Sequence, residues 1–179
     1  MIKSDKLVAQ EISEGFQALL DAYDSVTCAA SDCMDRMNAM FSDMKSIAGD
    51  VRMSGTALTV KTIAGDLSAV VYAVEQAQEG DIIVVDAHES KNTAFWGENI
   101  TLSAMNKGVK AAIIDGATRD VEEIRKLHFP VMSRGICPNV GCMAGYGVVG
   151  TSIQCAGVQV NPNDIIVIDG NGVVIVPFE

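Results

Sequence analysis

The chain has 179 residues, a formal net charge of −10 and a pI near 4.5, and 49% of its residues are hydrophobic although only 5% are aromatic. An acidic chain of this kind is a poor ligand for nucleic acids and anionic membranes, so we expect neither as a partner. The length fits one domain, 1–179, and no run of about 18 apolar residues is present that could cross a membrane.

Cysteine usage indicates a reducing compartment. The five cysteines are an odd number, they lie at positions 28, 33, 137, 142 and 155, and none forms a C-x-x-C pair. This pattern favours free thiols over disulfides or a zinc site. The polar start, Met1–Lys6, lacks the features of a secretory signal, so we expect a cytoplasmic protein.

The N-terminal part of the chain is expected to be helical. Apolar residues recur at helical spacing from about Lys6 to Leu20, and a second helix is expected from about Ala29 to Met40. The polar, glycine-bearing stretch Asp43–Arg52 is expected to be a loop.

The central part alternates predicted strands and helices. Strands are expected at 55–63, 82–86 and 109–114, and helices at about 65–78, 96–107 and 120–127, with a polar loop that carries His88 after the second strand. This alternation is typical of parallel crossover units. The C-terminal quarter, 154–176, contains several short strands, so we expect an α/β protein with a mixed sheet and no second domain.

The segment Gly145–Gly150 satisfies the G-x-G-x-x-G pattern of dinucleotide sites. In those sites the glycines follow a strand and open a helix, whereas here they follow a loop and lead into residues 151–153, which are expected to be extended. We therefore expect no dinucleotide or S-adenosylmethionine at this segment.

The sequence Asp115-Gly-Ala-Thr-Arg-Asp120 places a guanidinium beside a carboxylate where a buried strand leads into a helix. Ligands of open α/β sheets collect beyond the carboxyl ends of strands, and helix N-termini there favour anions. Arg119 can grip a carboxylate or a developing enolate oxygen, while Asp120 can hold a divalent cation. The alternative is an ordinary exposed ion pair in which Asp120 helps the helix to start.

These motifs together resemble the regulator of ribonuclease activity A (RraA) family. The resemblance runs from about Thr27 to Pro177, and its specific core is the Asp115–Asp120 element with the preceding Trp96-Gly97 helix start. It implies an α/β/β sandwich with a mixed sheet, assembled as a ring-shaped homotrimer that is sometimes doubled to a hexamer. The enzymes of this family are 4-hydroxy-4-methyl-2-oxoglutarate aldolases and oxaloacetate decarboxylases, and they use magnesium or manganese.

The resemblance also implies the roles of individual residues. Asp120 would hold the metal, largely through waters, Arg119 would contact the oxygens of an α-keto acid, and Glu98 would be an acidic group near the metal waters. The backbone amides that would cradle the substrate carboxylate belong to Gly97, Glu98, Asn99 and Ile100. The chain departs from some aldolases at Val71, which stands at the position of a histidine near the site.

The implied function is that of a divalent-metal-dependent carbon–carbon lyase acting on a small α-keto acid. Aldol cleavage and oxaloacetate decarboxylation both pass through a pyruvate enolate, which a cation and a guanidinium stabilise. The alternative is a non-catalytic regulator that resembles the ribonuclease E inhibitor and binds a protein partner. An acidic surface suits the binding of basic protein segments.

Overall fold

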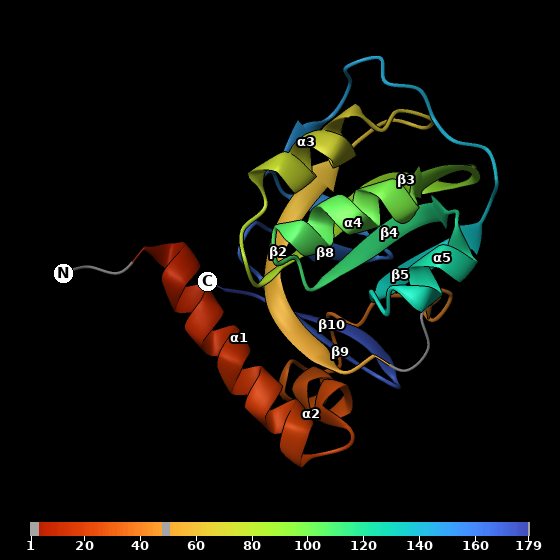
Figure 1. The fold of residues 1–179 in the computed structure, drawn as a ribbon. Coiled ribbons are helices and arrows are strands. Elements are labelled where there is room, and N and C mark those ends of the chain that lie inside the picture. Colours follow the sequence, from red (N-terminus) through yellow and green to blue (C-terminus); the bar gives the residue numbers. More distant parts are fainter. Residues whose placement is uncertain (1–3, 48–50, 179) are drawn as a thin grey trace.

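The computed structural model describes residues 4–47 and 51–178, so the expectation for the first three residues lies outside the described part. Its helices are α1 (Asp5–Ala22), α2 (Val26–Cys33), α3 (Ser68–Gln76), α4 (Glu98–Asn106) and α5 (Val121–Lys126) (Figure 1). Its strands are β1 (Lys45–Ser46), β2 (Met53–Lys61), β3 (Asp81–Trp96), β4 (Ala111–Thr118), β5 (Val131–Ile136), β6 (Val148–Val149), β7 (Ile153–Cys155), β8 (Val158–Val160), β9 (Ile165–Asp169) and β10 (Gly172–Val176).

The main sheet is mixed, as the sequence predicts. Its strands follow the order β1-β5-β4-β3-β2-β9-β10, and β6 pairs with β2 outside this path. The neighbours β2, β3, β4 and β5 run parallel, while β1, β6, β9 and β10 join them in antiparallel pairs. The strands β7 and β8 form a separate antiparallel pair. The parallel strands end at one edge, where the site described below lies.

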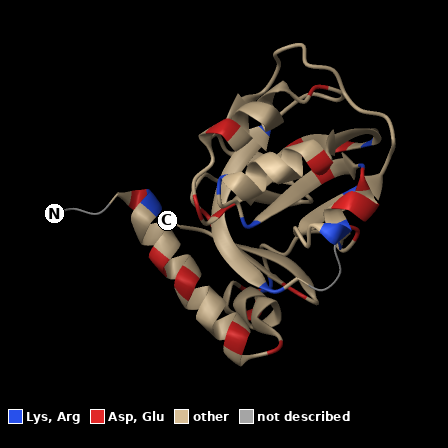
Figure 2. Ribbon diagram, in the orientation of Figure 1, with Lys and Arg blue, Asp and Glu red and all other residues tan. Residues whose placement is uncertain are grey.

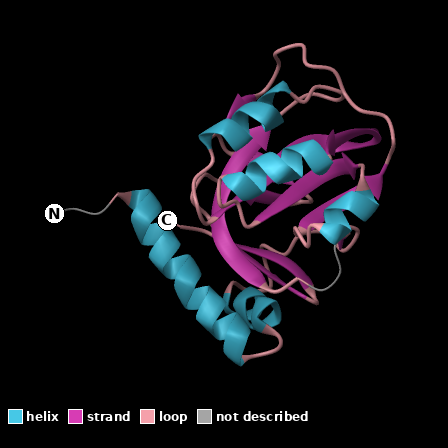
Figure 3. Ribbon diagram, in the orientation of Figure 1, coloured by secondary structure: helices cyan, strands magenta, loops and turns pink. Residues whose placement is uncertain are grey.

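Side chains that alternate along β3 divide the core into two layers. Ile83 and Val85 pack in a buried cluster with residues of α3, α4 and α5, which cover one face of the sheet (Figure 3). Ile82 and Val84 point to the opposite face and pack with residues of β7, β8 and β9. Because successive strand residues face opposite sides, an apolar run can serve both layers at once. The result is the expected α/β/β sandwich.

The helix α1 confirms the prediction for residues 6–20. The Ser4 hydroxyl accepts a hydrogen bond from the Leu7 amide at 3.4 Å at the start of the helix. Its buried residues include Ala9 and Leu20, and Ser13 Oγ lies 3.1 Å from Ser54 Oγ of β2. The helix therefore packs along the β2 side of the sheet (Figure 1).

The prediction of a helix from Ala29 to Met40 is wrong beyond Cys33, where α2 ends. Asp35, Arg36 and Asn38 have φ values of 55°, 65° and 64°, which break a right-handed helix. Met40 then donates its amide to Val173 O at 2.9 Å, so this segment turns to run beside β10. Met34, Met37 and Met40 recur at helical spacing in the sequence, but tertiary hydrogen bonds determine the structure of this segment.

The prediction of a polar loop after residue 86 is also wrong, because β3 continues to Trp96. The pairing with β4 slips between Asp86 and Ser90 and again between Ser90 and Ala94. His88 and Glu89 have φ values of 52° and 58° within this irregular stretch. Bulges of this kind interrupt the alternation of polar and apolar residues by which a strand is predicted.

Other boundaries differ by a few residues. The strand expected at 55–63 is β2, Met53–Lys61, and the helix expected from 65 begins at Ser68 as α3. Within the stretch 43–52, residues 45–46 pair with β5 as β1, and residues 48–50 lie outside the described part. The segment after Gly150 leads into β7 and forms no helix, as expected. Among the described residues, no helix is long and apolar enough to cross a membrane.

Candidate active site

Two strand-to-helix turns meet at the carboxyl edge of the sheet. Trp96 at the end of β3 pairs in register with Thr118 at the end of β4. The Thr118 hydroxyl and the Arg119 amide both donate to Trp96 O at 3.0 Å. These bonds hold the Arg119-Asp120 pair beside the first turn of α4, in the crevice where open α/β sheets collect ligands.

The Asp120 carboxylate faces α4 although the residue itself precedes α5. Its Oδ2 accepts a hydrogen bond from the Glu98 amide at 3.1 Å and lies 3.3 Å from Arg119 Nε. Asp120 makes no side-chain capping bond to α5 and has a left-handed φ of 55°. It therefore stabilises the start of α4, where negative charge interacts favourably with the helix dipole. About a third of each side chain of the pair is exposed, 34% for Arg119 and 33% for Asp120.

Gly97 permits the close approach of this pair to the helix. Its φ is −163°, an extended conformation open to any residue, so backbone freedom does not explain the glycine. A Cβ at this position would lie 2.6 Å from Asp120 Oδ2 and 3.2 Å from Arg119 Cγ. A side chain here would therefore displace the carboxylate or the guanidinium.

A buried hydrogen-bonded chain fixes the start of α4. Trp96 Nε1 donates to Thr101 Oγ1 at 2.8 Å, and this hydroxyl donates to Gly97 O at 2.9 Å. The Trp96 ring stacks on Phe129 with a centroid separation of 6.1 Å. Thr101 was not singled out from the sequence, since one threonine within a helix carries no signal before its tertiary partners are known.

A small cavity of about 40 Å³ opens at this point. Its lining residues come from both turns and from two loops: Leu67, Ala94, Trp96, Gly97, Asn99, Ile100, Arg119, Asp120 and Val140. Of the residues expected at the site, Glu98 is not in the lining, and its amide is already bonded to Asp120. The amides of Asn99 and Ile100 belong to the first turn of α4, where no helical carbonyl precedes them to accept their hydrogen bonds.

Sequence reasoning missed the wall formed by Leu67 and Val140. The Leu67 amide donates to Cys142 O at 2.9 Å, and the Ala94 amide donates to Asn139 O at 2.7 Å. The glycine-bearing segment around residue 140 is thereby tied to the turn before α3 and to the end of β3. The wall arises from long-range contacts, so no local pattern could have revealed it.

The donor set fits a divalent cation held largely by water. Asp120 presents one carboxylate whose Oδ2 is engaged by Glu98 and Arg119, which leaves Oδ1 for a cation or its waters. The described residues contain no cluster of three or more histidine, cysteine, aspartate or glutamate side chains suited to a metal. Magnesium keeps several of its waters and often binds through one or two carboxylates, so one aspartate at the mouth of a crevice is compatible with it.

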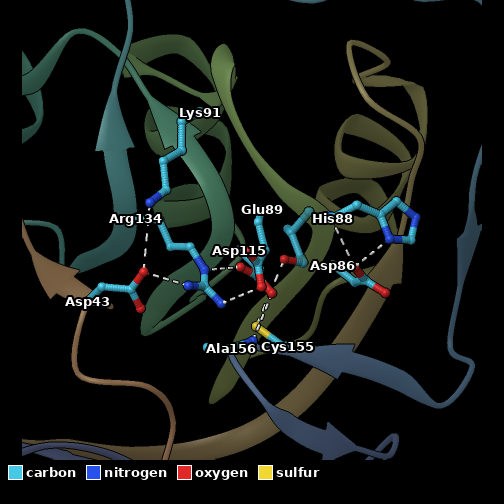
Figure 4. A network of polar contacts seen from close by, with 10 residues as sticks. Asp43, Asp86, His88, Glu89, Lys91, Asp115, Arg134, Cys155 and Ala156 are labelled. Carbon is cyan, nitrogen blue, oxygen red and sulfur yellow. Dashed lines mark hydrogen bonds and ion pairs between the residues drawn. The ribbon is translucent and has the colours of Figure 1, made fainter.

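A second polar cluster lies around Arg134, whose side chain is only 4% exposed (Figure 4). Its guanidinium pairs with Asp115 and Asp43 and lies 3.3 Å from Glu89. The other Asp115 oxygen accepts the Ala156 amide at 2.7 Å. These contacts join β4, β5 and the β7–β8 layer, so the cluster is structural.

The neighbouring Cys155 is part of the same structural region. Burial, with the nearby Asp115 and Asp86 carboxylates, raises the pKa of the Cys155 thiol well above its usual value. The thiol is therefore protonated at neutral pH and is a weak nucleophile.

The fold and the site define a class of protein: an α/β/β sandwich with an Arg-Asp pair at the first turn of a helix, at the carboxyl edge of parallel strands. A family model described as RraA-like, Aldolase/RraA, matches residues 27–175. The chain therefore belongs to the RraA-like aldolase/RraA family.

Individual relatives agree with this assignment. An uncharacterized protein of Methanocaldococcus jannaschii is 40% identical over 126 residues, which cover 70% of this chain and 61% of the relative. A Thermus thermophilus protein named 4-hydroxy-4-methyl-2-oxoglutarate aldolase is 28% identical over 84% of this chain and 92% of its own length. The solved structure of the RNA-processing inhibitor RraA from Thermus thermophilus matches with a TM-score of 0.79 at 27% identity, covering 87% of this chain and 94% of that chain.

Proposed function

We propose that this protein is a divalent-metal-dependent carbon–carbon lyase that acts on a small α-keto acid. The observation that carries the proposal is the convergence of the Arg119 guanidinium, the Asp120 carboxylate and the first turn of α4 on one crevice. The name of the Thermus aldolase supports this reading, since that protein matches most of the chain.

The groups at the crevice complement the pyruvate part of such a substrate. The amides of Asn99 and Ile100 at the α4 N-terminus suit its carboxylate. The Arg119 guanidinium suits the keto oxygen, and it cannot lose its charge at physiological pH. Asp120 would hold Mg²⁺ or Mn²⁺, which when bound supplies Lewis-acid stabilisation of the same oxygen.

Cleavage of the bond between C3 and C4 leaves its electron pair on the pyruvate half as an enolate. Arg119 stabilises the negative oxygen that develops, which is the usual role of a fixed donor at an oxyanion. The enolate then takes a proton at C3 to give pyruvate. We assign the movement of protons to Glu98, acting directly or through water from the partly exposed start of α4.

Decarboxylation of oxaloacetate is the simplest reaction of this kind. The C3–C4 bond breaks, CO₂ leaves, and no proton has to be removed from the substrate first. Aldol cleavage additionally requires a group that accepts the proton of the 4-hydroxyl. Both reactions deliver the same enolate to Arg119.

Pyruvate release from oxaloacetate tests the proposal. We expect release above the spontaneous rate in the presence of Mg²⁺ or Mn²⁺, loss of the excess with EDTA, and its return when the metal is restored. A rate equal to the spontaneous one with every divalent metal would contradict the proposal.

A protein-binding regulator is the second candidate function. Its support is the match to the RNA-processing inhibitor and the acidic character of the chain, to which the carboxylates along α1 contribute (Figure 2). Acidic surfaces steer basic partners, and such binding weakens with salt. Salt-sensitive binding to a basic protein, together with no keto-acid turnover, would favour this candidate.

A further inference from the structure

We infer that Thr101 is a positioning residue for the Asp120 carboxylate and thereby sets the affinity of the site for a divalent cation. This inference rests on the proposed function, in which Asp120 would hold Mg²⁺ or Mn²⁺. It is carried by a buried series of hydrogen bonds that begins at the Trp96 indole, passes through Thr101 and one peptide group, and ends at Asp120.

The peptide group between Gly97 and Glu98 connects Thr101 to Asp120. Its carbonyl oxygen, Gly97 O, accepts the Thr101 hydroxyl at 2.9 Å and the Thr101 amide at 3.0 Å. Its N–H belongs to Glu98 and donates to Asp120 Oδ2 at 3.1 Å. Because a peptide group is planar, a carbonyl that is held in one direction also fixes the direction of the N–H. Thr101 therefore orients the hydrogen bond that holds Asp120 Oδ2 and leaves Oδ1 for a cation.

The chemistry of its partners fixes how the Thr101 hydroxyl is used. An indole nitrogen only donates, and Trp96 Nε1 lies 2.8 Å from Thr101 Oγ1. A carbonyl oxygen only accepts, so the hydroxyl must accept from Trp96 and donate to Gly97 O. The exposed fraction is 0% for Thr101 and 1% for Trp96. Hydrogen bonds in such a dry interior are stronger than in water, and successive bonds polarise one another.

The Trp96 residue is held firmly enough to serve as the fixed end of this series. Its ring stacks on the buried Phe129 ring at a centroid separation of 6.1 Å and an interplanar angle of 7°. Its carbonyl accepts the Thr118 hydroxyl and the Arg119 amide, both at 3.0 Å. Trp96 thus binds the Arg119-Asp120 turn through its backbone and the start of α4 through its indole and Thr101.

Thr101→Val tests the inference, because valine has nearly the shape of threonine but can neither accept from Trp96 nor donate to Gly97 O. The readout is the dissociation constant for Mn²⁺, obtained from the electron paramagnetic resonance signal of free Mn²⁺, which requires no turnover. We expect this constant to rise by about 10- to 100-fold, the usual effect of removing a hydrogen-bond partner behind a metal ligand. Thr101→Ser keeps the hydroxyl and should restore most of the affinity.

Thr59→Val is the matched control. Thr59 is also 0% exposed, and its hydroxyl donates to Thr151 O at 2.7 Å, but it is outside the lining of the crevice. We expect Thr59→Val to bind Mn²⁺ as tightly as the natural chain. An equal loss of Mn²⁺ affinity in Thr59→Val and Thr101→Val would overturn the inference, because it would show a general effect of losing a buried hydroxyl.

Trp96→Phe approaches the same series from its other end. It keeps an aromatic ring against Phe129 but removes the donor that holds the Thr101 hydroxyl, so we expect weaker Mn²⁺ binding here too. Unchanged Mn²⁺ affinity in Thr101→Val would overturn the inference. If Thr101→Val does not fold, Trp96→Phe decides, and unchanged Mn²⁺ affinity in that variant would overturn it.

Asp120→Asn separates the inference from the proposed function. We expect it to weaken Mn²⁺ binding, since a neutral amide is a poorer ligand for a hard dication. No Mn²⁺ binding to the natural chain, or binding that Asp120→Asn leaves unchanged, would contradict the proposed metal site, and the inference would fall with it. Binding that depends on Asp120 but not on Thr101 would overturn the inference alone.

Discussion

The Arg119 and Asp120 side chains lie 3.3 Å apart, yet we expect them to fail differently when changed. Arg119→Lys keeps the charge but loses the planar fork that would face an enolate oxygen. We expect the transition state for oxaloacetate decarboxylation to lose about 2–4 kcal/mol of stabilisation, which is measured as a lower kcat/KM. Asp120→Asn keeps an oxygen that can accept the Glu98 amide but is a poorer ligand for a hard dication. Its rate should therefore recover in part at high Mg²⁺. Steady-state kinetics across a magnesium titration checks both results. Unchanged rates in both variants would show that Arg119 and Asp120 do not belong to the active site.

Gly97→Ala should reduce turnover strongly, because the added Cβ would lie 2.6 Å from Asp120 Oδ2. The cost of such overpacking is typically about 1–3 kcal/mol, and here it falls on the groups that would hold metal and substrate. Gly170→Ala is the control, since a Cβ there meets no atom within 4 Å and its φ is not positive. Kinetics and thermal unfolding should show reduced turnover in Gly97→Ala and unchanged turnover in Gly170→Ala. Equal activity of the two variants would contradict the role of Gly97 in the close approach of Asp120.

At the scale of the elements, the buried ion pair between Arg134 of β5 and Asp115 of β4 stabilises these two neighbouring strands. Arg134→Met should lower the free energy of unfolding by about 3–5 kcal/mol, because the buried Asp115 carboxylate would lose its counter-ion. Lys91→Ala is the control, since the half-exposed Lys91 lies 3.7 Å from Asp43 and such pairs contribute about 0–1 kcal/mol. Urea denaturation measures both, and a loss below 1 kcal/mol for Arg134→Met would contradict the structural role of the cluster.

Protonation of Asp66 in acid should weaken the hydrogen bonds that hold the loop after β5, because the Ala144 and Tyr146 amides donate to its carboxylate. Hydrogen bonds from Ser68, with those from the amides of Tyr146 and Ala144, hold the pKa of the Asp66 carboxyl below its usual value. A lowered pKa contributes stability that is fully present above the unfolded value of about 3.9 and is lost as the pH falls through the lower folded value. Asp66→Asn should therefore be less stable than the natural chain near neutral pH, and the difference should shrink in strong acid. Unfolding measured from pH 7 to pH 3 checks this, and a difference that does not change with pH would contradict it.

The elements also mark the limit of sequence-based prediction here. The alternating strands and helices from β2 to α5 were predictable because buried parallel strands are short apolar runs and helices carry a 3.6-residue period. The end of α2 and the bulged extension of β3 were not, because distant partners on β10 and β4 determine them. The same distinction applies to the site. Arg119 and Asp120 stand out in a local motif, whereas Thr101 and the Leu67–Val140 wall depend on contacts across the chain.

For the whole molecule, we predict a homotrimer whose sites lie at subunit boundaries. Five of the large exposed apolar side chains lie within residues 136–148: Ile136, Val140, Met143, Tyr146 and Val148. Apolar surface of this kind marks interaction sites when it is contiguous. Sedimentation equilibrium at micromolar concentration should give three times the chain mass of 18.9 kDa or a doubling of that assembly. A stable monomer would contradict the prediction.

We propose above all that the Arg119-Asp120 crevice stabilises a pyruvate enolate. Exchange of the methyl protons of pyruvate in D₂O, followed by proton NMR, measures enolate formation without any cleavage step. We expect exchange above the background that requires Mg²⁺ or Mn²⁺ and falls by about 10²–10³ in Arg119→Lys, the range for loss of an oxyanion donor. The proposal would be contradicted if the natural chain exchanged the methyl protons no faster than the background with every divalent metal. It would also be contradicted if Arg119→Lys exchanged them as fast as the natural chain.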